Sequence, residues 1–343
     1  MSNPVKHHYV AQHVLRRFCD ANGVLWTYDK EKNKIYPGRP RDQASGKHFY
    51  SFKGRDGTKT TVIELKFLGP IDKAGCIAIE RLFRRETLTD EQWIDFMRFA
   101  SAQMIRVESY FQRLDASLTP LLDESARRMF KYDPEFKKRL TKDLRDSGTS
   151  EKDIEGLLAS LARGEFKLKA NRGYIVSIFL KSLDQITKDF CRMEWDVVDT
   201  KDTDEVFLLS DNPLVLTDIG EGPPKPLGTR NPDIEVTMPL RPTTVAVGGW
   251  GKGVGYGTID TDYISVINQR TIEQAHRYVY APYRSDELLA KVVASQGRQV
   301  RTRVTRIKQG EATIIVPVFG NCGAEEAPAA AEPTSHVDPP AAV

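Results

Sequence analysis

The spacing of apolar residues changes near Trp195, and this change constrains the fold class more than any other feature of the sequence. Between residues 93 and 114, apolar side chains recur every three or four positions, which is the period of a helix with one buried face. After Trp195, short apolar runs such as 206–209 and 313–318 lie between glycine and proline residues, which is typical of strands. The pattern predicts an α+β protein, with a mostly helical amino-terminal two-thirds packed with a mostly antiparallel β carboxy-terminal third.

Individual elements follow from the same periods. Thr89 and Gln92 stand at the spacing of a capping box and mark the start of the clearest helix, 89–114. The charge-rich stretch 121–166 predicts a peripheral helical hairpin. We further expect helices over 9–18, 72–85, 173–191 and 271–279, and strands over 23–29, 206–209, 214–216, 244–247 and 313–318.

These elements divide the chain into three regions. We expect a mostly helical region with short amino-terminal strands over residues 1–193, and a mostly β region over residues 194–320. From 321 to 343 the composition shifts to Ala, Pro and Glu without an aromatic residue. Such a segment has too little apolar surface to offset the entropy lost on ordering, so we expect a disordered tail.

Charge and cysteine content limit the class of protein. Lys and Arg total 50 against 47 Asp and Glu, a net charge of +3, which excludes a strongly polyanionic or polycationic chain. The four cysteines are isolated and no CxxC occurs, so neither a structural zinc site nor a disulfide framework is expected. The amino terminus lacks the apolar core of a signal peptide, and no apolar run approaches the roughly 18 residues of a membrane span. We therefore expect a cytoplasmic protein with no membrane partner.

A set of short motifs occurs in one order along the chain. The most specific are His7-His8-Tyr9 near the start and Ser210-Asp211-Asn212-Pro213. The others are Leu15-Arg16-Arg17-Phe18, Leu25-Trp26-Thr27-Tyr28-Asp29, Phe49-Tyr50, Ile79-Glu80, and Gln103 with Arg106. With these motifs the chain resembles the domain-of-unknown-function 4238 family of uncharacterised bacterial proteins over residues 6–282. Ala11 and His13 depart from the proline and the aromatic residue that the family prefers there. The resemblance implies a soluble, intracellular bacterial protein and implies no activity.

The adjacent histidines His7 and His8 are candidates for acid–base chemistry or metal binding, because imidazole titrates near neutral pH. Neighbouring side chains diverge by about 100° on a helix and point to opposite faces on a strand. At most one of the two is therefore expected to face a given pocket. The alternative is structural: one imidazole bonds to a backbone carbonyl and orders the amino terminus, while the other is solvated.

The segment Ser210-Asp211-Asn212-Pro213 follows an apolar strand, so its polar groups are expected at a strand end, where functional side chains are often mounted. Asp211 would act as a base or a metal carboxylate, Ser210 as a hydroxyl donor and Asn212 as an orienting amide. The alternative is a local turn, because Asn before Pro favours turns and Asp and Ser cap backbone amides.

Polar residues also lie beside the apolar stripes of two predicted helices. Gln103 and Arg106 flank one stripe and Glu80 flanks another, so we expect these three side chains to face inward and close a pocket with His7 or His8. Glu64 competes for the role of Glu80. A buried Gln103 needs a hydrogen-bond partner, because an unpaired buried amide costs about 1–3 kcal/mol. The alternative for Glu80 is a surface ion pair with Arg84 four residues later.

A basic strand is predicted near the carboxyl terminus, where charged and apolar residues alternate. Its arginines would contact the phosphates of a nucleic acid; they are Arg298, Arg301, Arg303 and Arg306. The alternative is a solvated strand face. The glycines between residues 248 and 257 fit neither GxGxxG nor the Walker spacing, so they predict a connection between strands rather than a phosphate loop.

Two functional hypotheses follow. The first is a phosphodiester-cleaving, nuclease-like hydrolase with a His, a carboxylate and an arginine in one pocket, to which a divalent metal would bind. Its catalytic residues would be His7, His8, Glu80, Arg106 and Asp211, and its substrate-binding residues Gln12, Gln103, Ser210 and Asn212. The second is a non-catalytic binding or regulatory module whose polar cluster is structural. Convergence of the side-chain ends in one open cavity favours the first, and dispersal or mutual hydrogen bonding favours the second.

Overall fold

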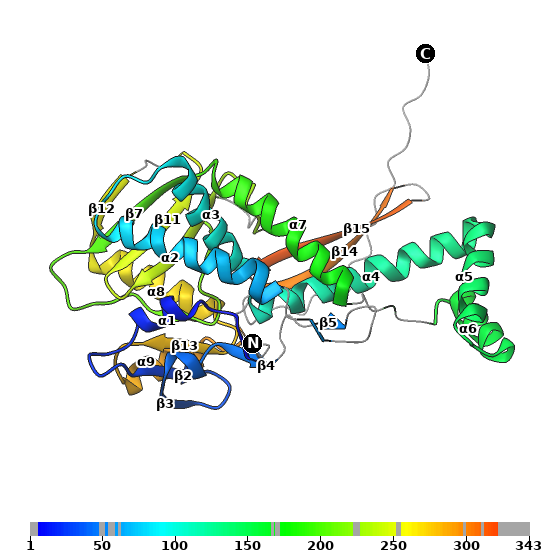
Figure 1. Ribbon diagram of the computed structural model, residues 1–343, viewed down its shortest axis with the longest axis horizontal. Coiled ribbons are helices and arrows are strands. Elements are labelled where there is room, and N and C mark those ends of the chain that lie inside the picture. The colour runs from blue at the N-terminus through cyan, green and yellow to red at the C-terminus, as the bar shows by residue number, and fades with distance from the viewer. Residues whose placement is uncertain are drawn as a thin grey trace, which may run out of the picture.

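The protein consists of one main body and a helical extension. The computed structural model describes residues 6–47, 52–53, 59–60, 63–165, 168, 172–221, 227–251, 255–297, 300–309 and 312–321. From the body, α4 (Glu108–Tyr132) extends to α5 (Pro134–Asp146) and α6 (Glu151–Arg163), which lie at the far end of the molecule (Figure 1). The predicted peripheral hairpin is thus confirmed as α5 and α6. Within the described part of the chain, no helix has the length and apolar character needed to cross a membrane.

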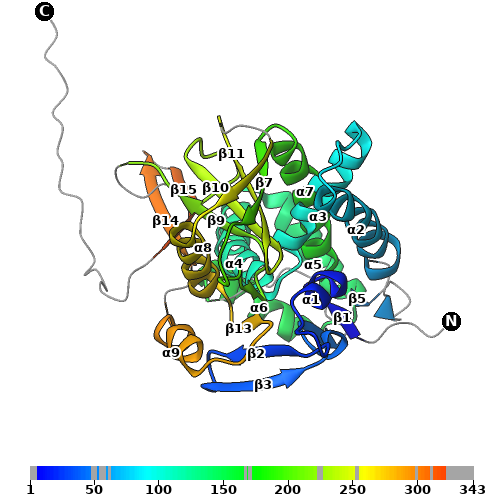
Figure 2. The same cartoon turned by 90° about the vertical axis from the view of Figure 1, so that its left-hand side faces the viewer.

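A five-stranded sheet forms the centre of the body. Its strands, in order across the sheet, are β12 (Gly255–Ile259), β7 (Glu194–Thr200), β11 (Thr244–Gly249), β10 (Ile234–Arg241) and β9 (Val215–Asp218). Helices lie on both faces, with α2 (Gly69–Phe83), α3 (Asp90–Ile105) and α7 (Arg172–Phe190) on one side and α8 (Thr261–Gln274) on the other (Figure 2). Every residue of β11 is buried, as expected for a strand that is covered on both faces.

Aromatic packing joins α3 (Asp90–Ile105) and α7 (Arg172–Phe190) to this sheet. The ring of Trp195 on β7 meets Phe96 of α3 at a centroid distance of 6.3 Å and Phe190 of α7 at 5.3 Å, both edge to face. On the opposite face, Ile264 and Ile267 of α8 pack against the sheet in a separate apolar cluster. The sheet is therefore the middle of three layers.

A second sheet joins the amino-terminal and carboxy-terminal parts of the chain. It has four strands, in the order β3 (Lys34–Gly38), β2 (Leu25–Asp29), β13 (Tyr278–Ala281) and β8 (Leu209–Ser210). The helix α9 (Asp286–Ala294) covers it, with Leu288 and Val292 against Tyr28 and Val279. Figure 2 shows this sheet below the central one.

Shorter elements surround the two sheets. At the amino terminus, β1 (Lys6–His8) pairs with β4 (Ser45–Lys47), and the helix α1 (Gln12–Arg17) and the 3₁₀ turn η1 (Pro40–Asp42) lie between them in sequence. The π-helix η2 (Ile63–Leu68) leads into α2 (Gly69–Phe83). Two further hairpins consist of β5 (Phe52–Lys53) with β6 (Lys59–Thr60), and of β14 (Val300–Gln309) with β15 (Ala312–Asn321).

The fold class is α+β, but the predicted arrangement is wrong in two respects. Helices occupy the middle of the chain as well as its amino-terminal part, and the central sheet is mixed because β12 runs parallel to β7. Apolar alternation identifies a strand from its own residues. It carries no information on the direction of the neighbouring strand, which depends on how the intervening chain crosses the sheet.

Two helix predictions also needed correction. The helix expected over 89–114 is interrupted at residues 106–107, because α3 ends at Ile105 and α4 begins at Glu108, although its capping box at Thr89 is present. The helix expected over 271–279 is α8, which begins at Thr261 and ends at Gln274, and the next apolar residues form β13 instead. Short apolar runs fit both the helical period of 3.6 residues and the strand period of 2, so pairing with distant strands decides which structure forms.

Some sequence predictions fall outside the described residues. These are the tail beyond residue 321, the motif Phe49-Tyr50, Cys322 and Arg298. Arg301, Arg303 and Arg306 are located only as positions on β14.

Candidate functional site

The His-His-Tyr motif begins the site on a short strand. The backbone N–H of Tyr9 donates to the carbonyl of Ala44 at 2.9 Å and extends the pairing of β1 with β4. His7 is fully buried, whereas His8 is half-buried and its Nε2 lies 3.1 Å from Nε2 of Gln12. The two imidazoles therefore have different surroundings, as expected for neighbours on a strand.

Arg106, the residue that follows α3, bonds to this motif. The Arg106 side chain is buried, and its Nε donates to the carbonyl oxygen of Tyr9 at 3.1 Å while Nη1 donates to Asp72 at 2.8 Å. Gln103, one turn earlier, is also fully buried, and with its side-chain oxygen turned toward Arg106 it accepts hydrogen bonds from Nε and Nη2 at 3.3 and 3.1 Å. The expected partner of Gln103 is thus present. These polar groups bond to each other and to the backbone rather than to a cavity.

Glu64 and Asp72 lie beside Arg106. Burial raises the pKa of both carboxyl groups, and that of Glu64 reaches about 7 although Arg106 opposes the shift. One side-chain oxygen of Glu64, Oε2, is buried with no hydrogen-bond partner among the described residues. Of the two candidates for this position, Glu64 and not Glu80 is therefore the carboxylate next to Arg106.

Glu80 lies elsewhere. Its side chain is 50% exposed on α2 and accepts a hydrogen bond of 2.7 Å from Arg17. The alternative partner Arg84 pairs with Glu86 instead. Neither the inward position nor the pair with Arg84 is seen for Glu80, because Arg17 on α1 approaches it from a distant part of the chain.

The Ser-Asp-Asn-Pro segment forms a turn that is satisfied by backbone groups. The Ser210 hydroxyl donates to the carbonyl of Asn212 at 2.9 Å and accepts from its N–H at 3.2 Å. The Asp211 carboxylate accepts three backbone N–H bonds of 2.8–2.9 Å, from His276, Arg277 and Tyr278. The Asn212 amide donates to the carbonyl of Gln274 at 3.3 Å. The turn thereby connects β8 to the segment that joins α8 and β13.

The same Asp211 lines a polar cavity of about 780 Å³ between this turn, the amino-terminal motif and the start of α4. The other residues around it are Tyr9, Glu31, Tyr36, Asp42, Gln43, Ala44, Ser45, Gly46, Glu108, Gln112, His276, Arg277 and Tyr278. We call this space the acidic cavity. Of the catalytic and substrate-binding residues proposed from the sequence, Asp211 is the one found among its described lining residues.

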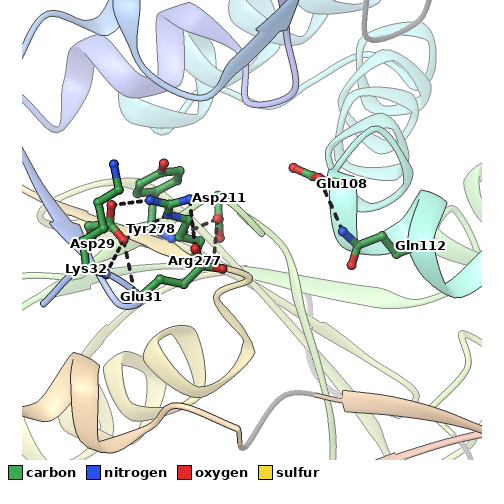
Figure 3. A network of polar contacts seen from close by, with 8 residues as sticks. All are labelled: Asp29, Glu31, Lys32, Glu108, Gln112, Asp211, Arg277 and Tyr278. Carbon is green, nitrogen blue, oxygen red and sulfur yellow. Dashed lines mark hydrogen bonds and ion pairs between the residues drawn. The ribbon is translucent and has the colours of Figure 1, made fainter.

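One arginine of the acidic cavity is already neutralised. Arg277 donates from Nε and Nη2 to Asp29 at 3.0 and 2.7 Å, and Nη1 lies 2.9 Å from Glu31 (Figure 3). The guanidinium carbon also lies 4.9 Å from the centre of the Tyr278 ring. Figure 3 shows Glu108 and Gln112 on α4, separate from this ion-pair group. Four carboxylate residues, Glu31, Asp42, Glu108 and Asp211, line the cavity against this one arginine, and Asp42 also lies 3.5 Å from Arg41.

The tyrosines of the cavity stay protonated. Burial, reinforced by the negative charge of Asp211, raises the pKa of the Tyr9 hydroxyl far above its ordinary value. Burial also raises the pKa of Tyr36 to about 12, and Tyr36 shares a hydrogen bond with Tyr278. Neutral hydroxyls and carboxyl groups therefore lie together in this cavity, and burial raises the pKa of the Asp211 carboxyl although its backbone N–H bonds oppose the shift. Ionised carboxylates accept hydrogen bonds from a cationic ligand, whereas a tyrosine hydroxyl can donate as well as accept.

Sequence reasoning missed Tyr36, Glu108, Arg277 and Tyr278. The alternation Tyr278-Val279-Tyr280 was the available signal, but it lay within the residues assigned to a helix. Arg277 and Asp29 lie 248 residues apart, so no local pattern could pair them. Across the described residues, no group of three or more His, Cys, Asp or Glu side chains is placed to hold a metal ion.

The chain is thus an α+β protein with two features near its amino terminus. One is the buried contact of Arg106 and Gln103 with the segment around Tyr9, and the other is the acidic cavity with its tyrosines. The chain belongs to the family described as protein of unknown function DUF4238, whose model matches residues 6–285. This match confirms the resemblance seen in the motifs. No curated protein and no solved structure was found to match the chain.

Proposed function

We propose that this protein is a binding module whose acidic cavity holds an organic cation, an ammonium or guanidinium group such as that of a basic peptide side chain. One observation carries the proposal. Four carboxylate residues line the cavity, while its one described arginine, Arg277, is already paired with Asp29 and Glu31. A cationic ligand would pair with the carboxylates of this lining, of which Glu31 also contacts Arg277 and Asp42 also lies 3.5 Å from Arg41.

The lining chemistry suits such a ligand. Carboxylates accept charge-assisted hydrogen bonds from ammonium and guanidinium groups, which are stronger than neutral ones. Tyrosine rings add attraction through their faces, as the position of the Arg277 guanidinium over Tyr278 illustrates within the protein itself. The volume of about 780 Å³ lies in the range typical of small-molecule sites.

The phosphodiester-hydrolase hypothesis receives less support. It requires a histidine, a carboxylate and an arginine around one phosphate, but Arg106 donates to Tyr9 and Asp72, and Glu80 bonds to Arg17 on the surface. The carboxylates of the acidic cavity would also repel a phosphodiester. The geometry therefore favours the binding module, in which the Arg106 and Asp211 networks are structural.

A calorimetric titration tests the proposal. The purified protein is titrated with spermidine and with arginine amide, and separately with inorganic phosphate and a short single-stranded DNA. We expect the two cations to bind and the two anions not to bind, with an affinity that falls as salt is added because exposed charges are screened. Binding of the anions alone, or of no probe, contradicts the proposal.

Variants locate the binding. Glu108→Gln removes one exposed carboxylate of the cavity, and we expect cation affinity to fall about two- to fivefold, in line with an exposed ion pair. Glu155→Gln is the matched control, because Glu155 is an exposed carboxylate on α6, far from the cavity. An equal loss of cation affinity in both variants would indicate that the cation is attracted by the overall charge of the protein and does not bind in the acidic cavity.

The hydrolase alternative has its own test. The protein and its His8→Ala variant are assayed on nucleic acids and on simple phosphodiesters with Mg²⁺, Mn²⁺ and Zn²⁺. Turnover that disappears in the variant, with unchanged melting, would favour the hydrolase over the binding module.

A cytoplasmic location is also proposed and is supported by Cys19, Cys76 and Cys191, which are free thiols.

A further inference from the structure

A second cavity lies on the other side of the Ser-Asp-Asn-Pro turn and has the opposite character. Its volume is about 340 Å³, and half of its described lining residues are leucines. Leu114, Leu118 and Leu121 come from α4, Leu216 comes from β9, and Leu214 immediately precedes that strand. Asn212 lines this cavity while the preceding residue, Asp211, lines the acidic cavity, so the turn separates the two spaces. We call the second space the leucine cavity.

One charged side chain, Arg113 of α4, is found in the described lining of the leucine cavity. Among the described residues, no carboxylate lies within ion-pair distance of its guanidinium, unlike Arg106, Arg128 and Arg277, which all have such partners. A guanidinium stays charged in proteins even when burial disfavours the charge. Burial lowers the pKa of Arg113, and the neighbouring Tyr110 only partly opposes the shift.

An unpaired cation in an apolar cavity is costly for the protein alone. Arg113 is half-buried, so its charge loses part of its hydration without gaining a carboxylate partner among the described residues. The cost is removed when a ligand supplies the anion. Arginine offers a planar fork that pairs with both oxygens of a carboxylate, whereas the leucines offer surface only to an apolar body.

We propose that the leucine cavity binds an apolar carboxylic acid, such as a medium-chain fatty acid, with its carboxylate on Arg113 and its chain between α4 and β9. The volume of about 340 Å³ is at the lower end of small-molecule sites, which favours a chain of medium length. This inference does not depend on the proposed function. The acidic cavity and the leucine cavity have no described lining residue in common.

The test uses decanoate as the probe and the full chain as the protein. Titrations compare decanoate with decanol and decyl phosphate, all below the concentrations at which they form micelles. We expect decanoate to bind at least about tenfold more tightly than decanol, because only decanoate pairs with the guanidinium. Equal binding of decanoate and decanol, tighter binding of decyl phosphate, or absence of decanoate binding overturns the proposal.

Two variants assign the site. Arg113→Met keeps the length and apolar stem of the side chain but removes its charge, so decanoate affinity should fall about tenfold while decanol affinity is unchanged. Arg128→Met, on the same helix but outside the cavity, should leave both affinities as in the parent. Leu118→Trp fills the cavity and should reduce binding of both probes. If Arg113→Met binds decanoate like the parent, the carboxylate is not on Arg113 and the inference fails.

Discussion

Arg106 donates from its Nε to the carbonyl oxygen of Tyr9 at 3.1 Å, across 97 residues of sequence. This bond ties the junction between α3 and α4 to the amino-terminal motif, and the second bond of Arg106 reaches Asp72 on α2. One side chain thus joins three parts of the fold. It also places the motif against α4, where Tyr9 and Glu108 line the same cavity.

Replacement of Arg106 should be strongly destabilising. Arg106→Met leaves the Asp72 carboxylate without its cation and the Tyr9 carbonyl without its donor. Removing one partner of a buried pair costs about 3–5 kcal/mol, and we expect the lower end because the Asp72 side chain keeps 26% of its exposure. Urea unfolding measures the loss. Arg98→Met on the exposed face of α3 is the control and should change stability by less than about 0.5 kcal/mol.

Gln103→Leu should cost about 1–3 kcal/mol, because the buried Arg106 guanidinium loses the amide oxygen that accepts from it. The denaturant midpoint should shift while the slope of the transition stays constant. Gln269→Leu, at an exposed position of α8, serves as the comparison. Coincident midpoints for Gln103→Leu and the parent would show that this amide does not support the junction.

The Glu64 carboxyl should make stability depend on pH near neutrality. Its folded-state pKa of about 7 lies above the unfolded value of about 4.3. Between these values the folded protein binds more protons than the unfolded chain, so stability falls as pH rises and levels off above about pH 7. Glu64→Gln removes this contribution.

The measurement is the difference in the free energy of unfolding between Glu64→Gln and the parent. We expect this difference to grow in favour of the variant by on the order of 1–3 kcal/mol from about pH 5 to about pH 8. Glu155→Gln, which changes an exposed carboxylate, should show a difference that does not vary with pH. A constant difference for Glu64→Gln as well would mean that Glu64 is ionised throughout this range.

The two histidines should differ in their effect on stability. His7 is fully buried on β1, whereas His8 is half-buried beside Gln12. If their role is structural, both alanine variants melt at lower temperature than the parent, and His7→Ala loses more because it leaves a larger void. Differential scanning calorimetry of the two variants decides the order. A His8→Ala variant that melts like the parent would favour a functional role for that imidazole.

Local chemistry determined the parts of this protein that depend on near neighbours. The capping box of Thr89 and Gln92 is formed by side chains three residues apart, and the stripes of α2 and α7 follow from a period of 3.6 residues. The motifs were also sufficient to recognise the family. Each of these features is complete within a short stretch of chain, so the sequence alone was enough to predict it.

Only the tertiary structure decided which distant groups meet. Whether residues 278–281 form a strand depended on β2 and β8, which pair with them on either side. The Asp211 carboxylate, equally consistent with a base or a turn, is bonded to amides 65–67 residues away. The charge of the acidic cavity depends on the pairing of Arg277 with Asp29 across 248 residues. A periodic pattern indicates which face of a helix or strand is apolar. The partner of a polar group depends instead on how the chain crosses the sheets and on which distant segments are buried together.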